Sequence, residues 1–138
     1  MPHSIVMKWF TLLFTLFIIL IIVLADTGNL GIFRLIYRIP YADKVGHFIL
    51  YGILCLLINL TLFRSIPSQS RSWIALISGL TLALLIGLEE LSQRGFSNRT
   101  FDLVDLSASY LGLIFFSWLA LLADSRQSMK GAGAEGMD

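Results

Sequence analysis

The chain has 138 residues, of which 57% are hydrophobic and only 14% are charged, and its mean hydropathy is +0.81. A soluble domain of this length needs far more polar surface, so the composition indicates a single-domain integral membrane protein. The net charge of +1 gives no electrostatic basis for binding nucleic acid, and no basic stripe is visible. The single cysteine, Cys55, lies inside an apolar run, which excludes an internal disulfide and is typical of a small buried side chain.

Four apolar runs, each of roughly 16–19 residues, are near the lower length limit for crossing a hydrocarbon core of about 30 Å. They cover approximately Trp9–Ala25, Val45–Phe63, Trp73–Leu88 and Leu106–Ala123. Because a helix rises only about 1.5 Å per residue, the residues that flank these runs must lie at the interface or slightly inside it. We therefore expect an all-α integral membrane protein with four transmembrane helices in a compact bundle.

The first run also has features of a secretory signal peptide, because Val23-Leu24-Ala25 before Asp26 resembles a cleavage site. Its hydrophobic stretch is longer than the usual 7–15 residues or so, and only Lys8 precedes it, so we expect a retained helix.

The segment between the first two runs and the segment after the fourth run differ in character. Residues 26–40 combine helix-breaking glycines with apolar residues interleaved with Arg34 and Arg38, which predicts a short interfacial helix. Residues 125–138 are polar and rich in glycine, which is typical of a flexible tail. The expected division is thus a membrane domain over residues 1–124 and a polar C-terminal tail over residues 125–138.

The orientation of the bundle follows only weakly from charge. The face that carries both termini receives five basic residues, Lys8, Arg64, Arg71, Arg126 and Lys130. The opposite face also receives five, Arg34, Arg38, Lys44, Arg94 and Arg99. Since Lys44 and Arg99 lie among carboxylates that can neutralise them, we expect the termini to be cytoplasmic.

Polar residues gather at the ends of three of the runs, and alternating crossings bring all three ends to the same face. The first cluster contains Asp43, His47 and Tyr51, which are spaced four residues apart and share a helix face, with Lys44 beside them. An imidazole just beneath the membrane surface can shuttle a proton, bind a phosphate or ligate a metal. The alternative is a helix N-terminus capped by Asp43, with Tyr51 as an ordinary interfacial side chain.

The second and third clusters flank the next connection. Glu90 and Gln93 share a face at the end of the third run, whereas Glu89 fits an ordinary solvated helix end. The third cluster contains Arg99, Asp102 and Asp105. Asp105 directly precedes the fourth run and is suited to cap that helix, and Arg99 can fork onto two carboxylates or onto a lipid phosphate. The alternative is a salt-bridged loop that ties the helices together.

Acidic residues outnumber basic residues around this face. The acids are Asp43, Glu89, Glu90, Asp102 and Asp105, and the bases are Lys44, Arg94 and Arg99. Such a group, if partly buried, must share protons, charge His47 or bind a cation. We therefore expect a pH- or cation-sensitive site, which thermal stability measured between about pH 5 and 8 would reveal. A dedicated metal site is not expected, because one histidine with scattered carboxylates is a poor ligand set.

At these residues the chain resembles the VanZ-like family of membrane proteins. The stretch 43–51 reads Asp43-Lys44-Val45-Gly46-His47-Phe48-Ile49-Leu50-Tyr51 and is similar to the family motif D-K-x-x-H-F-x-x-Y. The later motif E-x-x-Q…R-x-x-D-x-x-D is matched by Glu90, Gln93, Arg99, Asp102 and Asp105. Ser109 stands where the family usually has asparagine. Gly112 matches a family glycine, but the next expected glycine position is Phe116, which puts close helix packing there in question.

The resemblance implies a small multi-pass protein of the bacterial cell membrane, with both motifs facing outward. The family's name-giving member is associated with resistance to the lipoglycopeptide antibiotic teicoplanin, and the family carries no settled biochemical activity.

Two kinds of function fit these residues. In the first, the site binds or modifies an amphiphile of the cell envelope: a lipid headgroup, a lipid-linked precursor or a lipidated drug. Lys44 and Arg99 would then hold an anionic headgroup, and His47, Glu90 and Asp105 would transfer protons. The remaining predicted binding residues are Asp43, Tyr51, Gln93, Asp102 and Ser109. No cofactor is expected, and the residues leave open whether the protein is an enzyme.

In the second kind of function, the protein is a non-catalytic accessory or structural subunit. The charged motifs are then an ion-pair latch, and the lipid-facing sides bind a membrane-protein partner. An ion or proton pathway is less favoured, because the third run has no charge in its middle and Asn59 is the only strongly polar side chain deep in the second.

Overall fold

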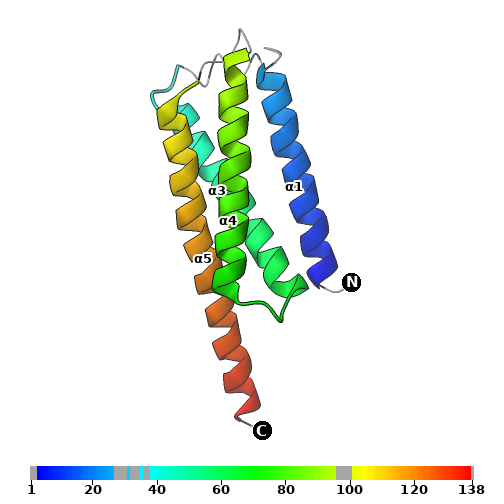
Figure 1. The fold of residues 1–138 in the computed structure, drawn as a ribbon. Coiled ribbons are helices and arrows are strands. Elements are labelled where there is room, and N and C mark those ends of the chain that lie inside the picture. Colours follow the sequence, from blue (N-terminus) through cyan, green and yellow to red (C-terminus); the bar gives the residue numbers. More distant parts are fainter. Residues whose placement is uncertain (1–2, 27–30, 32–34, 36–37, 96–100, 138) are drawn as a thin grey trace.

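The computed structural model of the protein describes residues 3–26, 31, 35, 38–95 and 101–137, and most of these residues are helical (Figure 1). The helices are α1 (His3–Asp26), α3 (Ala42–Ser65), α4 (Arg71–Ser92), the 3-10 helix η1 (Gln93–Gly95) and α5 (Leu103–Glu135). Four of them, α1, α3, α4 and α5, are long and apolar enough to cross a membrane. The prediction of an all-α membrane protein with four spanning helices is therefore confirmed for the described residues.

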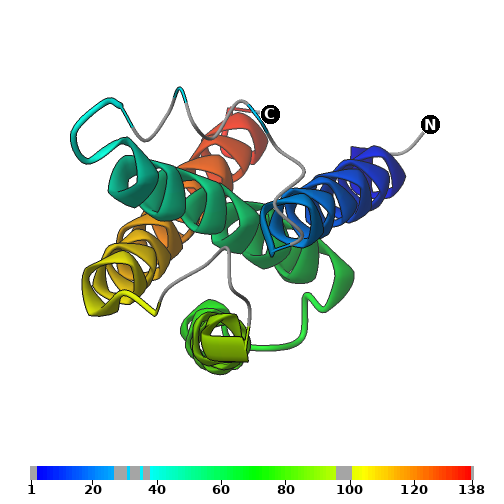
Figure 2. The ribbon, with the colours of Figure 1, turned by 90° about the horizontal axis from the view of Figure 1, so that it is seen from above.

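Helix α3 is the centre of the bundle. It packs against α1, α4 and α5, and α4 and α5 also pack against each other. Viewed along the bundle, α5 crosses α3, and α4 lies on the opposite side of α3 from α1 (Figure 2). Helix α1 packs mainly against α3 and leaves large apolar side chains such as Trp9, Leu13 and Leu20 exposed, as expected for a helix whose outer face contacts lipid.

Glycines allow α3 and α5 to approach closely. A Cβ atom at Gly112 on α5 would overlap the backbone carbonyl oxygen of Phe48 on α3. Close packing also occurs at Phe116, where the family resemblance led us to expect a second glycine. There the small residue is on the other helix, because the Phe116 ring lies directly over Gly52 of α3.

A second set of contacts ties α4 to α5. The hydroxyl of Tyr110 on α5 donates a hydrogen bond to the backbone carbonyl of Ala83 on α4, at 3.0 Å. Gly87 makes room for it, since a Cβ there would lie 2.9 Å from the Tyr110 oxygen. The tyrosine thus anchors the two helices through a backbone group that small residues leave accessible.

Polar side chains also meet deep inside the bundle, where Asn59 and Cys55 of α3 are completely buried. The Asn59 amide nitrogen donates to the Cys55 carbonyl at 2.9 Å, and the Asn59 amide oxygen accepts from Ser78 of α4 at 2.8 Å. The Cys55 sulfur lies 3.1 Å from the hydroxyl of Ser117 on α5. These contacts join α3, α4 and α5 far from water, where an unsatisfied polar group would cost several kcal/mol.

One expectation about the segments outside the spanning runs differs from the structure, and a second is not supported by it. Helix α5 continues to Glu135, so residues 125–135, expected to form a flexible tail, are helical and project beyond the other helices (Figure 1). Extending an existing helix requires no new nucleation, and Gln127, Met129 and Lys130 favour it. The interfacial helix expected over residues 26–40 is not supported, because most of that segment lies outside the described residues. Among its described residues, Leu35 is helical and Arg38, Ile39 and Pro40 form turns and a bend.

The glycine at the α3–α5 contact gives a stability prediction. Gly112→Ala should lower the free energy of unfolding in detergent by about 1–3 kcal/mol, because its methyl group would be forced against the Phe48 backbone. Gly79→Ala on α4 is the matched control, since its Cβ would meet only the Ser117 hydroxyl at 4.0 Å. Equal effects of the two substitutions on thermal unfolding would contradict the close contact at Gly112.

Candidate functional site

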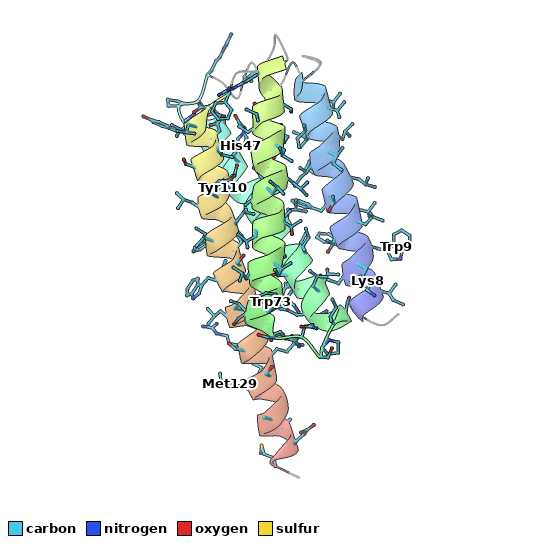
Figure 3. All side chains as sticks on the ribbon, viewed as in Figure 1. Lys8, Trp9, His47, Trp73, Tyr110 and Met129 are labelled. Carbon is cyan, nitrogen blue, oxygen red and sulfur yellow. The ribbon has the colours of Figure 1, made fainter. Side chains whose placement is uncertain are left out.

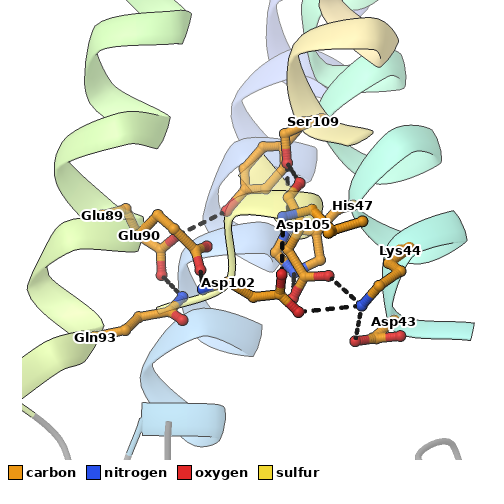
Figure 4. A network of polar contacts seen from close by, with 11 residues as sticks. Asp43, Lys44, His47, Glu89, Glu90, Gln93, Asp102, Asp105 and Ser109 are labelled. Carbon is orange, nitrogen blue, oxygen red and sulfur yellow. Dashed lines mark hydrogen bonds and ion pairs between the residues drawn. The ribbon is translucent and has the colours of Figure 1, made fainter. Parts of the chain in front are cut away.

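The ends of three helices meet at the end of the bundle opposite both termini. The N-terminus of α3, the C-terminus of α4 with η1, and the N-terminus of α5 lie there, and His47 is far from Lys8 and Trp73 (Figures 1 and 3). The structure thereby brings together nine of the residues that the sequence placed in its three clusters and, one turn further, the predicted binding residue Ser109 (Figure 4). The nine are Asp43, Lys44, His47, Tyr51, Glu89, Glu90, Gln93, Asp102 and Asp105. Arg99 lies outside the described residues.

Lys44 is the centre of the half of the site that α3 and α5 form. Its ammonium nitrogen is 3.0 Å from an oxygen of Asp105 and 3.2 Å from oxygens of Asp43 and Asp102. We call these four residues the Lys44 cluster. An anionic headgroup at Lys44 would face three carboxylates, so the geometry favours a structural role for this lysine over the expected headgroup contact.

The carboxylates around Lys44 also have the spacing of a cation site. One oxygen each from Asp43, Asp102 and Asp105 lies within 4.8 Å of the others. The lysine ammonium contacts all three, so it supplies the positive charge that these acids need. The arrangement accounts for the three aspartates without a metal ligand set.

His47 lies between two residues of α5. Its Nδ1 atom is 3.2 Å from the Ser109 hydroxyl, and its Nε2 atom is 3.8 Å from Oδ2 of Asp105. The Ser109 oxygen also lies 3.0 Å from the backbone carbonyl of Asp105, to which it can donate its single proton. If Ser109 donates its proton to the Asp105 carbonyl, its oxygen accepts a hydrogen bond from Nδ1–H of His47. If Ser109 instead donates to Nδ1, the proton of a neutral His47 is on Nε2, which faces the Asp105 carboxylate.

Ser109 is completely buried. A hydroxyl in that position orients the imidazole rather than attacking a substrate.

Glu89 belongs to the site, although the sequence suggested an ordinary solvated helix end. Its carboxylate accepts a hydrogen bond from the Tyr51 hydroxyl at 3.3 Å and one from the Gln93 amide at 2.7 Å. The Gln93 contact follows from the four-residue spacing on α4, which was visible in the sequence. The Tyr51 contact joins α4 to α3 and could not be read from local spacing.

Glu90 holds the connection that leads into α5. Its side chain is only 1% exposed, and its Oε1 atom accepts a hydrogen bond of 3.0 Å from the backbone N–H of Asp102. This contact fixes where α5 begins. It favours a positioning role for Glu90 over the expected proton transfer.

The helix caps differ from the expected ones. Asp102, rather than Asp105, is the N-cap of α5, and its side chain accepts a hydrogen bond of 2.8 Å from the backbone N–H of Val104. Asp105 lies in the first turn and contacts Lys44. Helix α3 begins after Tyr41, which makes no side-chain cap, so Asp43 is not the cap of that helix either.

Arg94, one of the bases expected to offset the acids, lies over the ring of Phe101, with its guanidinium carbon 4.6 Å from the ring centroid. This contact bridges the ends of the connection between η1 and α5.

A small cavity lies beside the acid–base side chains, where α1, α3 and α4 meet. Its volume is about 70 Å³, and its lining is formed by Ile18, Ile21, Ile22, Gly46, His47, Leu50, Tyr51 and Glu89. We call it the His47–Glu89 notch. The site therefore has two halves: the ion-paired Lys44 cluster between α3 and α5, and a notch with polar and apolar walls between α3, α4 and α1.

Comparisons with protein-family models, with curated proteins and with solved structures give no match for this chain.

The Lys44 cluster predicts strong and coupled mutational effects. Lys44→Met should lower the free energy of unfolding by about 1–3 kcal/mol, because it leaves three carboxylates facing one another. Adding Asp105→Asn should restore part of the loss, and thermal unfolding in detergent measures both variants. Lys130→Met, on the exposed end of α5, is the control. Simple additivity of the Lys44 and Asp105 substitutions would show that the two side chains do not interact.

Asp102 gives a pH prediction with a defined sign. The hydrogen bond from the Val104 N–H, aided by Lys44, holds the pKa of Asp102 below its ordinary value. Because the pKa of Asp102 is lower in the folded state, its ionised form stabilises the fold at pH values above the ordinary pKa, which is about 4. This stabilisation is lost as the pH falls through the lower pKa of the folded state.

Asp102→Asn should therefore flatten the loss of stability below about pH 4 and leave the slope above pH 5 unchanged, because asparagine keeps the cap. Unfolding measured as a function of pH tests this, with Glu135→Gln as the control. If Asp102→Asn lost stability below pH 4 as steeply as the wild-type protein, Asp102 would not contribute to the acid sensitivity of the fold.

Proposed function

We propose that the protein is a VanZ-like protein of the bacterial cell membrane, with both termini in the cytoplasm and the site at the outer interface. There it binds, or binds and modifies, an amphiphile of the cell envelope. The motif residues that carry the resemblance and that the structure describes lie at the end of the bundle away from the termini, which agrees with this orientation.

The observation that carries the proposal is the His47–Glu89 notch. It places an imidazole, a phenol and a carboxylate beside the isoleucines of α1, at the end of membrane-spanning helices. Polar side chains at such a depth are costly and are usually associated with function. A notch with apolar and polar walls suits a molecule that has an acyl chain and a polar head.

Within this proposal, the two halves of the site have different tasks. The Lys44 cluster holds α3 and α5 together and keeps His47 in place through Asp105 and Ser109. The notch contacts the amphiphile. If a reaction occurs there, hydrolysis or transfer at a phosphate or acyl group fits best, with His47 as the proton carrier.

The test is protection of a susceptible bacterial host against teicoplanin, measured as the minimal inhibitory concentration. His47→Ala, which removes the imidazole, and Glu90→Ala, which removes the acceptor for the Asp102 N–H, should abolish protection while membrane insertion and protein level stay normal. Glu135→Gln on the far end of α5 is the control. Full protection by both site variants would eliminate a role for this site in the phenotype.

A second candidate function is supported by the Lys44 cluster. In an accessory or structural subunit the whole group of charges would be an ion-pair latch, and Lys44 already bridges acids of two helices. Exchanging the charges, with Lys44→Asp and Asp105→Lys together, should then restore function lost in either single variant. A latch also predicts that one membrane protein is recovered with the chain in constant proportion.

A further inference from the structure

Glu89 is a membrane-interface carboxylate whose described donors are both neutral. Tyr51 and Gln93 each donate one hydrogen bond to it, and the ion pairs found among the described residues do not include it. Its position in the last turn of α4 adds the partial negative charge of the helix C-terminus. A carboxylate so placed attracts a cation.

The space beside Glu89 has the size of a small polar group. The notch, at about 70 Å³, holds roughly two groups of the size of water, each of which takes about 30 Å³. A primary ammonium on one carbon fits such a volume more readily than the bulkier trimethylammonium group. Two oxygens of Glu89 accept one hydrogen bond each, so lone pairs remain for further donors.

The other walls suit the same chemistry. The rings of His47 and Tyr51 lie with centroids 5.7 Å apart, and aromatic faces attract organic cations. The remaining walls include the isoleucines Ile18, Ile21 and Ile22, which suit the methylene groups that carry an amine. A phosphate or carboxylate would be repelled by Glu89, and the nearby ammonium of Lys44 is already shared among three acids.

We propose that the His47–Glu89 notch binds the primary ammonium group of an envelope lipid headgroup, with the Glu89 carboxylate as its counter-ion. This inference rests on the proposed function and specifies the ligand chemistry of that site. A lipid is favoured over a free amine because α1, which forms one wall, exposes large apolar side chains on its outer side, as a lipid-facing helix does.

The test measures lipid binding to the full-length protein in detergent by native mass spectrometry. The added lipids are phosphatidylethanolamine, phosphatidylcholine and phosphatidylglycerol with identical acyl chains, and free ethanolamine is a separate arm. Wild-type protein should bind phosphatidylethanolamine about tenfold more tightly than the other two lipids, as expected for one charge-assisted hydrogen-bonding contact. Free ethanolamine should not compete at the same concentration.

Two variants remove the contact in different ways. Glu89→Gln removes the charge and should abolish the preference for phosphatidylethanolamine. Gly46→Leu should have the same effect by filling the notch, since a Cβ at Gly46 meets nothing within 4 Å. Glu135→Gln, which neutralises a carboxylate at the distant end of α5, should keep the full preference.

The outcomes separate this inference from the proposed function. Saturable lipid binding without headgroup preference, or with a preference that survives both notch variants, overturns the ammonium site and leaves an amphiphile-binding protein. Equal competition by free ethanolamine supports the ammonium chemistry and overturns the lipid as its source. Absence of saturable binding for every lipid, with teicoplanin protection insensitive to the site, overturns both proposals.

Discussion

The structure depends on one ammonium group shared by three carboxylates. Lys44 stands in the first turn of the central helix, and its partners Asp102 and Asp105 open the helix that packs most closely on it. At the edge of a hydrocarbon layer, charges are tolerated only when they are paired or hydrated. The same contact therefore neutralises the acids, joins α3 to α5 and sets the position of His47 relative to Asp105.

Helices α3, α4 and α5 pack closely together, whereas α1 packs mainly against α3 alone. Gly112 lets α5 lie against the α3 backbone, and the buried contacts around Asn59 tie both helices to α4. Helix α1 packs mainly on α3, yet it supplies the isoleucines that close the His47–Glu89 notch. The notch thus borders the helix that the rest of the bundle encloses least.

The sequence predicted well what depends on long runs and on alternation. Four apolar runs gave the four helices, and an even number of crossings gave the meeting of the motif residues at one end. It predicted poorly what depends on contacts between distant residues. Asp102 and Asp105 are equally suited to cap a helix, and the choice is made by Glu90, which holds the Asp102 backbone from twelve residues earlier. Glu89 looked solvated because its partner Tyr51 lies 38 residues away.

The central claim, that the motifs converge at one face of the membrane, is tested most directly by labelling single cysteines with an impermeant maleimide in sealed vesicles. The background is Cys55→Ala, and the labelled positions are Tyr41→Cys, Arg94→Cys and Leu103→Cys on one face, and Ser68→Cys and Arg126→Cys on the other; all five side chains are exposed. The account predicts that the first three react from one side and the last two only from the opposite side. Reaction of Tyr41→Cys and Leu103→Cys from different sides would contradict it.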